Sequence, residues 1–150
     1  MSGLPAAGKD VWVATHLAGW PVVSLDAIRR ARGVSPARGQ GGVVHAAREL
    51  AKDHLRARRS FVWNATNVTR RLRTPLVELF AAYGARVRIV YVEPPLAELR
   101  ARNRRRRDAV PDGVIERLLD KLDFPELTEA HAVEHVVDQR DPCTGGAHGV

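Results

Sequence analysis

Cysteine, aromatic residues and long apolar runs are all scarce in this chain of 150 residues. Its one cysteine, Cys143, excludes a disulfide within the chain and is typical of a reducing cytoplasm. No apolar run approaches the length of a membrane span and no signal peptide opens the sequence, so we expect a cytoplasmic protein without membrane contact. The six histidines lack metal-ligand spacing, and we expect no structural metal.

Positive charge is concentrated in one segment. The chain has 24 Lys and Arg against 17 Asp and Glu, a net charge of +7. Six arginines between Arg100 and Arg107 nearly account for this excess. A local excess points to a phosphate or polyanion near that segment rather than to a uniformly basic surface. The hydrophobic content of 45% is ordinary for a single globular domain.

A phosphate-binding motif stands near the start of the sequence. Residues 3–10 read Gly-Leu-Pro-Ala-Ala-Gly-Lys-Asp, the G-x-x-x-x-G-K form of a P-loop. Such a loop points backbone N–H groups at phosphates, and its lysine reaches the β and γ oxygens. A helix over residues 11–17 would add its positive dipole end, whereas the alternative is a simple turn before an ordinary helix. The residues expected to bind the nucleotide here are Gly3, Pro5, Ala6, Ala7, Gly8, Lys9, Asp10 and Val11.

The motif departs from the usual P-loop in two ways. Asp10 stands where a hydroxyl normally binds Mg²⁺, and since a carboxylate can also bind a hard cation, Asp10 is a candidate Mg²⁺ ligand. A P-loop also follows a buried strand, but only Met1 and Ser2 precede Gly3. We therefore expect that strand, an apolar segment of roughly five to eight residues, upstream of Met1.

Strands alternate with helices along the chain. Apolar runs predict strands over residues 21–25, 60–63, 87–92 and 132–137. Helical patterns and end signals predict helices over residues 11–17, 27–32, 43–58 and 69–83, from 94 into the arginines, and across 115–122. The expected fold is α/β, a parallel sheet with helices on both faces. We expect this domain over residues 1–137, with a frayed tail over 138–150 and a mobile loop over 33–42.

Two of these helices have clear apolar faces. The face of the helix over residues 43–58 is predicted to consist of Val44, Ala47, Ala51 and Leu55. The helix after Thr69, its expected N-cap, ends at Gly84, and its face is predicted to consist of Leu72, Leu76, Leu79, Phe80 and Tyr83.

Polar residues follow two of the predicted strands, at the edge of the sheet where ligands bind. Asp26 could supply the carboxylate that a kinase needs for the acceptor hydroxyl, and Arg29 is three residues further on a helix. The alternative is that Asp26 merely caps this helix. Asn64, Thr66 and Asn67 offer polar groups either to a substrate or to an ordinary turn.

The arginine run has two interpretations. On a helix, Arg102 and Arg106 would lie one turn apart and reach the same phosphates, which suits a lid at about residues 100–110 that offsets charge and excludes water. The alternative is a solvated charge run.

Taken together, these motifs make the chain resemble the P-loop kinases of the 5′-polynucleotide kinase type, over roughly residues 3–122. The resemblance rests on the P-loop, on Asp26-Ala27-Ile28-Arg29, on Ala65-Thr66-Asn67 and on Arg102-Asn103 with Val110-Pro111. It implies that Asp26 is the general base and that Arg29 contacts the acceptor phosphate. It also implies that Thr66 and Asn67 help to bind the acceptor, and that Arg102 and Arg106 belong to a lid over ATP. Ala65 departs from the family, in which the phage enzyme has an aspartate.

We expect an ATP-dependent kinase that uses Mg²⁺ and moves the γ-phosphoryl group onto a hydroxyl, with the 5′ end of a nucleic acid as the favoured acceptor. The net charge suits a polyanion, although only 5% of the residues are aromatic, too few for an evident stacking platform. One alternative is a kinase for a small metabolite or antibiotic, and another is a nucleotide-binding module without catalysis. The sequence leaves the oligomeric state open.

Overall fold

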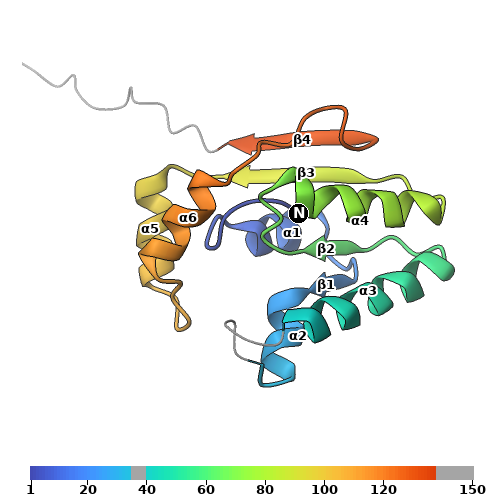
Figure 1. The fold of residues 1–150 in the computed structure, drawn as a ribbon, viewed down its shortest axis with the longest axis horizontal. Helices are drawn as coiled ribbons and strands as arrows, with labels where there is room; N and C mark the ends of the chain where they lie inside the picture. Colours follow the sequence, from blue (N-terminus) through green and yellow to red (C-terminus); the bar gives the residue numbers. More distant parts are fainter. Residues whose placement is uncertain (35–39, 138–150) are drawn as a thin grey trace, which may run out of the picture.

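The computed structural model describes residues 1–34 and 40–137 of the chain. The expected tail, Cys143 and part of the loop expected over residues 33–42 lie outside these ranges. The strand predicted over residues 132–137 is confirmed in its bounds. In chain order the elements in Figure 1 are α1 (Lys9–His16), β1 (Val22–Ser24), α2 (Leu25–Ala31), α3 (Gln40–Arg56), β2 (Val62–Asn64), α4 (Arg70–Ala82), β3 (Arg88–Glu93), α5 (Leu96–Arg104), α6 (Asp112–Asp120) and β4 (Ala132–Val137).

The strands pair in parallel but form two small sheets. β1 pairs with β2, and β3 pairs with β4. The prediction of parallel strands is confirmed, whereas the prediction of one continuous sheet is wrong for the described residues. The physical reason is that β2 and β3 do not pair with each other, because the start of the chain lies between them.

The first three residues connect the two sheets. The backbone N–H of Ser2 donates to the carbonyl of Val90 over 2.8 Å, and the carbonyl of Ser2 accepts from the N–H of Val92 over 3.0 Å. On the β2 side, the N–H of Gly3 donates to the carbonyl of Thr66 over 3.0 Å. The P-loop therefore begins at a point that is fixed by hydrogen bonds to both sides.

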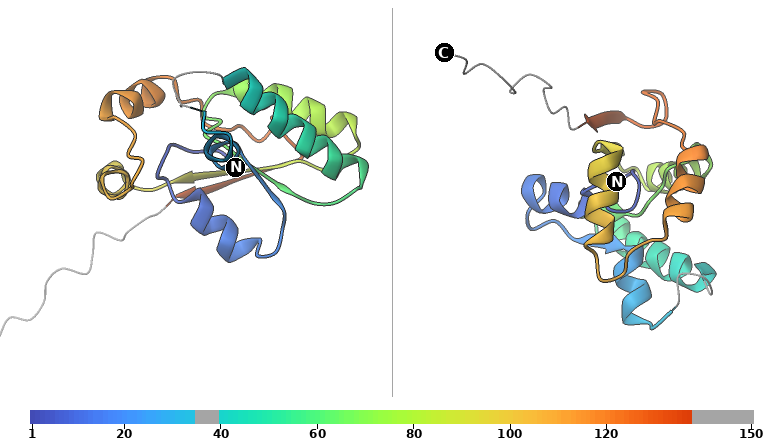
Figure 2. Two further views of the ribbon diagram at one scale, coloured as in Figure 1. Left: turned by 90° about the horizontal axis from the view of Figure 1, so that it is seen from below. Right: turned by 90° about the vertical axis from the view of Figure 1, so that its left-hand side faces the viewer.

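Helices cover both faces of these strands. Figure 2 shows α1 on one side of the strands and both α3 and α4 on the other. Each side has its own cluster of buried apolar side chains. The cluster on the α1 side also takes in α5 and α6 and consists of Leu4, Ala7, Trp12, Val13, Val62, Val68, Val90, Val92, Leu99 and Ile115. The cluster under α3 and α4 consists of Val23, Ala47, Ala51, Leu55, Trp63, Leu76 and Phe80.

The predicted apolar faces of α3 and α4 are only partly correct. In α3 the fourth buried position is Val43 rather than Val44, because Val43 continues the four-residue spacing of Ala47, Ala51 and Leu55. In α4 the Thr69 cap is confirmed, with its hydroxyl accepting from the N–H of Leu72 over 3.3 Å. The predicted burial of Leu72 and Tyr83 is wrong, since they are 53% and 41% exposed.

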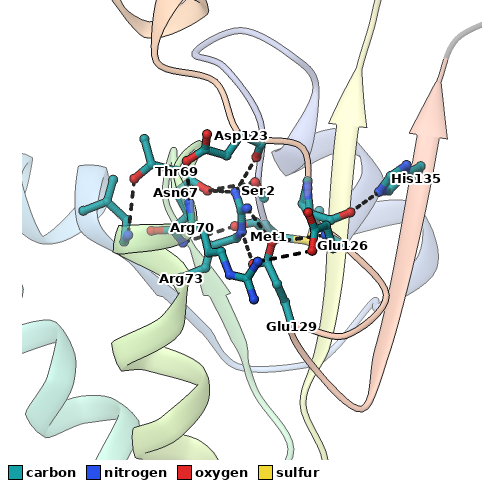
Figure 3. A network of polar contacts seen from close by, with 12 residues as sticks. Met1, Ser2, Asn67, Thr69, Arg70, Arg73, Asp123, Glu126, Glu129 and His135 are labelled. Carbon is teal, nitrogen blue, oxygen red and sulfur yellow. Dashed lines mark hydrogen bonds and ion pairs between the residues drawn. The ribbon is translucent and has the colours of Figure 1, made fainter.

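Arg73, which has no predicted role, is instead the buried charge of α4. Its guanidinium forms an ion pair with Glu129 over 2.7 Å, and the two side chains are 3% and 4% exposed. The same guanidinium donates to the carbonyls of Asn67, over 3.1 Å, and Asp123, over 2.9 Å (Figure 3). The hydrogen bonds from Arg73 to the Glu129 carboxylate hold the pKa of Glu129 below its ordinary value. Arg73 thus joins α4 to the segment between α6 and β4.

Replacing Arg73 by methionine is expected to lower the free energy of unfolding by about 3–5 kcal/mol, because Glu129 is left buried and unpaired. The exposed pair of Arg70 and Glu126 on the same two segments provides the control. Arg70→Met should change stability by about 0–1 kcal/mol. Urea unfolding of both variants measures the difference, and equal small losses would contradict a structural role for the buried pair.

Candidate functional site

The loop from Gly3 to Lys9 is held in a shape that requires glycine. Gly3 has φ 141°, and a Cβ there would lie 2.5 Å from the carbonyl oxygen of Val92. Gly8 and Ala6 also have positive φ, at 100° and 64°, so the loop curls back on itself before α1 begins. This geometry lets the backbone approach a ligand closely at the N-terminus of α1.

The side chain of Lys9 lies along this loop. Its ammonium donates to the carbonyls of Gly3 and Leu4, each over 2.8 Å. Burial lowers the pKa of Lys9 from 10.5 to about 8, Asp10 and Asp26 act to raise it, and Arg106 acts to lower it. The charges of the neighbouring Asp10 and of two distant residues, Asp26 and Arg106, therefore act on the lysine of the P-loop.

The pKa of Lys9 predicts proton uptake when a nucleotide binds. Near pH 8.5 part of the free protein has a neutral Lys9, because its pKa is about 8, and phosphate charges next to the amine would raise that pKa again. Calorimetry at pH 8.5 in buffers of different ionisation enthalpy should show uptake of up to about one proton per nucleotide. Lys9→Met should abolish this uptake. Equal heats in all buffers for the unaltered chain would contradict the prediction.

Asp10 lies against the end of β2. Its carboxylate accepts a hydrogen bond of 2.5 Å from the amide of Asn64, which is 7% exposed. Mg²⁺ is commonly bound by one or two carboxylates together with nucleotide phosphates and water. In the described ranges no group of three or more His, Cys, Asp or Glu could hold a metal by itself. Binding of Mg²⁺ by Asp10 stays a prediction.

Asp26 lies in the first turn of α2 and does not cap it. The cap is Ser24, whose hydroxyl accepts from the N–H of Ala27 over 3.2 Å. The alternative of Asp26 as the cap is therefore wrong, because α2 begins at Leu25, two residues earlier than a cap at Asp26 would allow. The carboxylate forms an ion pair with Arg29 and is 67% exposed. Its charge also acts on Lys9, whose pKa it raises.

Arg29 has a second partner that the sequence analysis missed. The side-chain oxygen of Gln40 accepts hydrogen bonds from Nε and Nη2 of Arg29, over 3.2 and 2.8 Å. Gln40 falls in the glycine-containing stretch predicted as a loop, but it is the first residue of α3. The spacing of Ala47 and Val43 was the available signal, because it extends the helix toward Gln40.

The two residues predicted to bind the acceptor after β2 lie beside the P-loop. Asn67 has φ 44°, and its amide donates to the carbonyl of Met1 over 3.2 Å (Figure 3). The carbonyl of Asn67 accepts from the hydroxyl of Ser2 over 2.9 Å. These contacts support the residues that enter the P-loop. An acceptor-binding role for Thr66 and Asn67 stays a prediction.

Arg102 and Arg106 do not share a helix face, so that prediction is wrong. α5 ends at Arg104, and the N–H of Arg106 donates to the carbonyl of Asn103 over 3.1 Å in a tight turn. In the same turn the side chain of Asn103 forms two hydrogen bonds with the backbone of Val110.

Both arginines nevertheless face the P-loop. Nη1 of Arg102 donates to the carbonyl of Ala7 over 3.3 Å and would lie 3.1 Å from a Cβ at Gly8. Arg102 also pairs with Glu98 and lines an open pocket of about 450 Å³ along α5. Arg106 acts electrostatically on Lys9. The arginine run thus brings positive charge to the phosphate-binding loop.

Known protein families provide a comparison for this arrangement. A family model described as an AAA domain matches residues 1–125, which include the P-loop, Asp26 and the arginine run. The chain belongs to the AAA domain family. No curated protein matches its sequence.

Family membership supports a nucleotide-binding function of the kinase or ATPase kind for this AAA domain, with an α/β fold of the P-loop NTPase type. The residues present suit a nucleotide, since Gly3 and Gly8, packed against Val92 and Arg102, allow the loop to curl at the N-terminus of α1, where backbone N–H groups bind anions. None of the helices of this AAA domain in the described ranges is long and apolar enough to cross a membrane.

Proposed function

We propose that this AAA domain is an ATP-dependent kinase that transfers the γ-phosphoryl group to a hydroxyl. The observation that carries this proposal is the P-loop lysine itself, which lies along the carbonyls of Gly3 and Leu4 while the charges of Asp26 and Arg106, from distant parts of the chain, act on it. A carboxylate that faces the P-loop lysine is the group that a kinase needs near the acceptor hydroxyl. An ATPase without an acceptor has no need for Arg29 beside that carboxylate.

Each residue has a separate task in this proposal. ATP with Mg²⁺, held by the P-loop backbone and Asp10, supplies the phosphoryl group. Asp26 accepts the proton of the acceptor hydroxyl, and Arg29, oriented by Gln40, binds a phosphate of the acceptor. Lys9 and Arg106 offset negative charge on the phosphates. In this proposal Lys9 and Arg106 act on the phosphates of ATP, and Arg29 acts on the phosphate of the acceptor. The carboxylate of Asp26 acts on the hydroxyl that receives the phosphoryl group.

The 5′ end of a nucleic acid is the acceptor that we favour. It offers a hydroxyl for Asp26 and a neighbouring phosphate for Arg29, and the net charge of +7 favours a polyanion. A small metabolite is the second candidate, because four of the aromatic side chains are buried and unable to stack on bases, namely Trp12, Trp63, Phe80 and Tyr91.

Transfer from ATP labelled in its γ-phosphate tests the proposal. The chain is incubated with 5′-hydroxyl oligonucleotides, with the same oligonucleotides already 5′-phosphorylated, and with a panel of metabolites. Label on the 5′-hydroxyl oligonucleotides alone supports the favoured acceptor, and label on a metabolite supports the second candidate. ATP binding without transfer to any acceptor overturns the kinase and leaves a nucleotide-binding module.

A further inference from the structure

Asn103 is one of the few buried polar side chains in the described ranges, at 2% exposed. Its amide nitrogen donates to the carbonyl of Val110 over 2.6 Å, and its amide oxygen accepts from the N–H of Val110 over 3.0 Å. The two residues are seven positions apart in the chain. The side chain therefore closes the segment between them into a loop, which we call the arginine loop (residues 103–110).

The closed end of the arginine loop is anchored in the core. Val110 packs against the apolar cluster that contains Leu99 and Ile115. The N–H of Arg106 also donates to the backbone carbonyl of Asn103. Asn103 thus fixes the arginine loop through both its backbone and its side chain.

The positive charge of the arginine loop explains why its two ends are joined by hydrogen bonds. It carries four consecutive arginines, residues 104–107, all of them exposed. The like charges within such a run repel one another and favour an extended segment without a fixed position. Without the bonds to Val110, the repulsion would move Arg106 away from Lys9. The neighbouring Arg102 would still be tied to Ala7.

We propose that Asn103 is a positioning residue that holds the arginine loop over the phosphates of the bound nucleotide and so acts through Arg106. The inference rests on nucleotide binding at the P-loop, as the proposed function does, but it does not depend on which acceptor is used. A purely structural Asn103 would lower stability and leave the contribution of Arg106 to binding unchanged.

A double-mutant cycle on ATP binding separates these two roles. The dissociation constant of ATP is measured by calorimetry for the unaltered chain, Arg106→Ala, Asn103→Ala and the double variant, at a temperature where circular dichroism shows all of them folded. Loss of a charge-assisted contact weakens binding by about tenfold or more. We expect each single variant to show this loss and the double variant to lose no more than either.

Leu55→Val is the control, because it loosens the apolar cluster under α3 and α4, against which no residue of the arginine loop packs. It should lower the melting temperature with an unchanged dissociation constant. If Asn103→Ala does not fold, Asn103→Ser replaces it in the cycle. Failure of both to fold would overturn the inference, because Asn103 would then be structural.

Other outcomes are equally decisive. Losses that add in the double variant, or ATP binding by Asn103→Ala at full strength, overturn the inference while leaving the kinase proposal intact. An Arg106→Ala variant with full affinity overturns it as well, since there is then no contribution for Asn103 to transmit. A chain that binds ATP and phosphorylates no acceptor refutes the kinase proposal, and the cycle still decides the role of Asn103.

Discussion

Lys9→Ala should abolish productive use of ATP. The Lys9 ammonium bonds to the loop carbonyls of Gly3 and Leu4, and in a P-loop this lysine is the residue that reaches the β and γ phosphates. Removing one such stabilising charge typically lowers the rate by about 10²–10³-fold. The loss here should be at the upper end, because the site is buried enough to lower the pKa of Lys9 to about 8, and charges act more strongly there.

The measurement is phosphoryl transfer and ATP hydrolysis by the purified variant, with Lys52→Ala as the control. Lys52 is a half-buried lysine on α3 that pairs with Glu49, far in the sequence from the P-loop. Its replacement should leave both activities unchanged. A folded Lys9→Ala variant with normal turnover would show that residues 3–9 are not a functional P-loop.

Local patterns in the sequence were sufficient to predict most of the helices and strands. Thr69 satisfies the first turn of α4, and Gly84, with φ 77°, ends it, so both ends of this helix are determined by neighbouring residues. The valine-rich run over residues 132–137 likewise predicts β4. These signals depend on a few consecutive residues and need no knowledge of the rest of the fold.

Burial in α4 was not predictable in the same way. Leu72 lies on the apolar side of the helical pattern but is exposed, whereas the adjacent Arg73 is buried. The partner of Arg73 is Glu129, 56 positions later in the chain. A charge becomes acceptable in the core only when such a distant partner arrives, and no local pattern encodes that pairing.

In the candidate site, too, features encoded by neighbouring residues were predictable, whereas features that depend on distant parts of the chain were not. The P-loop follows from its glycine spacing, and the charges of Asp26 and Arg106 act on Lys9. The hydrogen bonds between the Asn103 side chain and Val110 were not predicted, because they depend on a reversal of the chain after Arg104. The cap of α2 was misassigned because Ser24 and Asp26 are both good caps, and only the helix start distinguishes them.

Asp26→Asn should lower the rate of phosphoryl transfer by about 10²-fold or more while ATP binding is retained, because asparagine cannot accept the hydroxyl proton. The structure makes this substitution unusually clean. Ser24 caps α2, so the helix start does not depend on Asp26. Gln40 still holds Arg29 by two hydrogen bonds, so the phosphate contact stays in place. Loss of the exposed pair with Arg29 should cost about 0–1 kcal/mol of stability.

Ser24→Ala separates catalysis from helix stability. Removal of the cap should lower the free energy of unfolding by about 1 kcal/mol and leave the transfer rate unchanged. Arg29→Ala should raise the KM for the acceptor much more than that for ATP, since within the described ranges Arg29 bonds to Asp26 and Gln40 and forms no hydrogen bond or ion pair with the P-loop. Single-turnover rates with saturating ATP measure all three variants. If Asp26→Asn transfers at the normal rate, Asp26 is not the base, and its closeness to Lys9 would serve only to offset charge on the lysine.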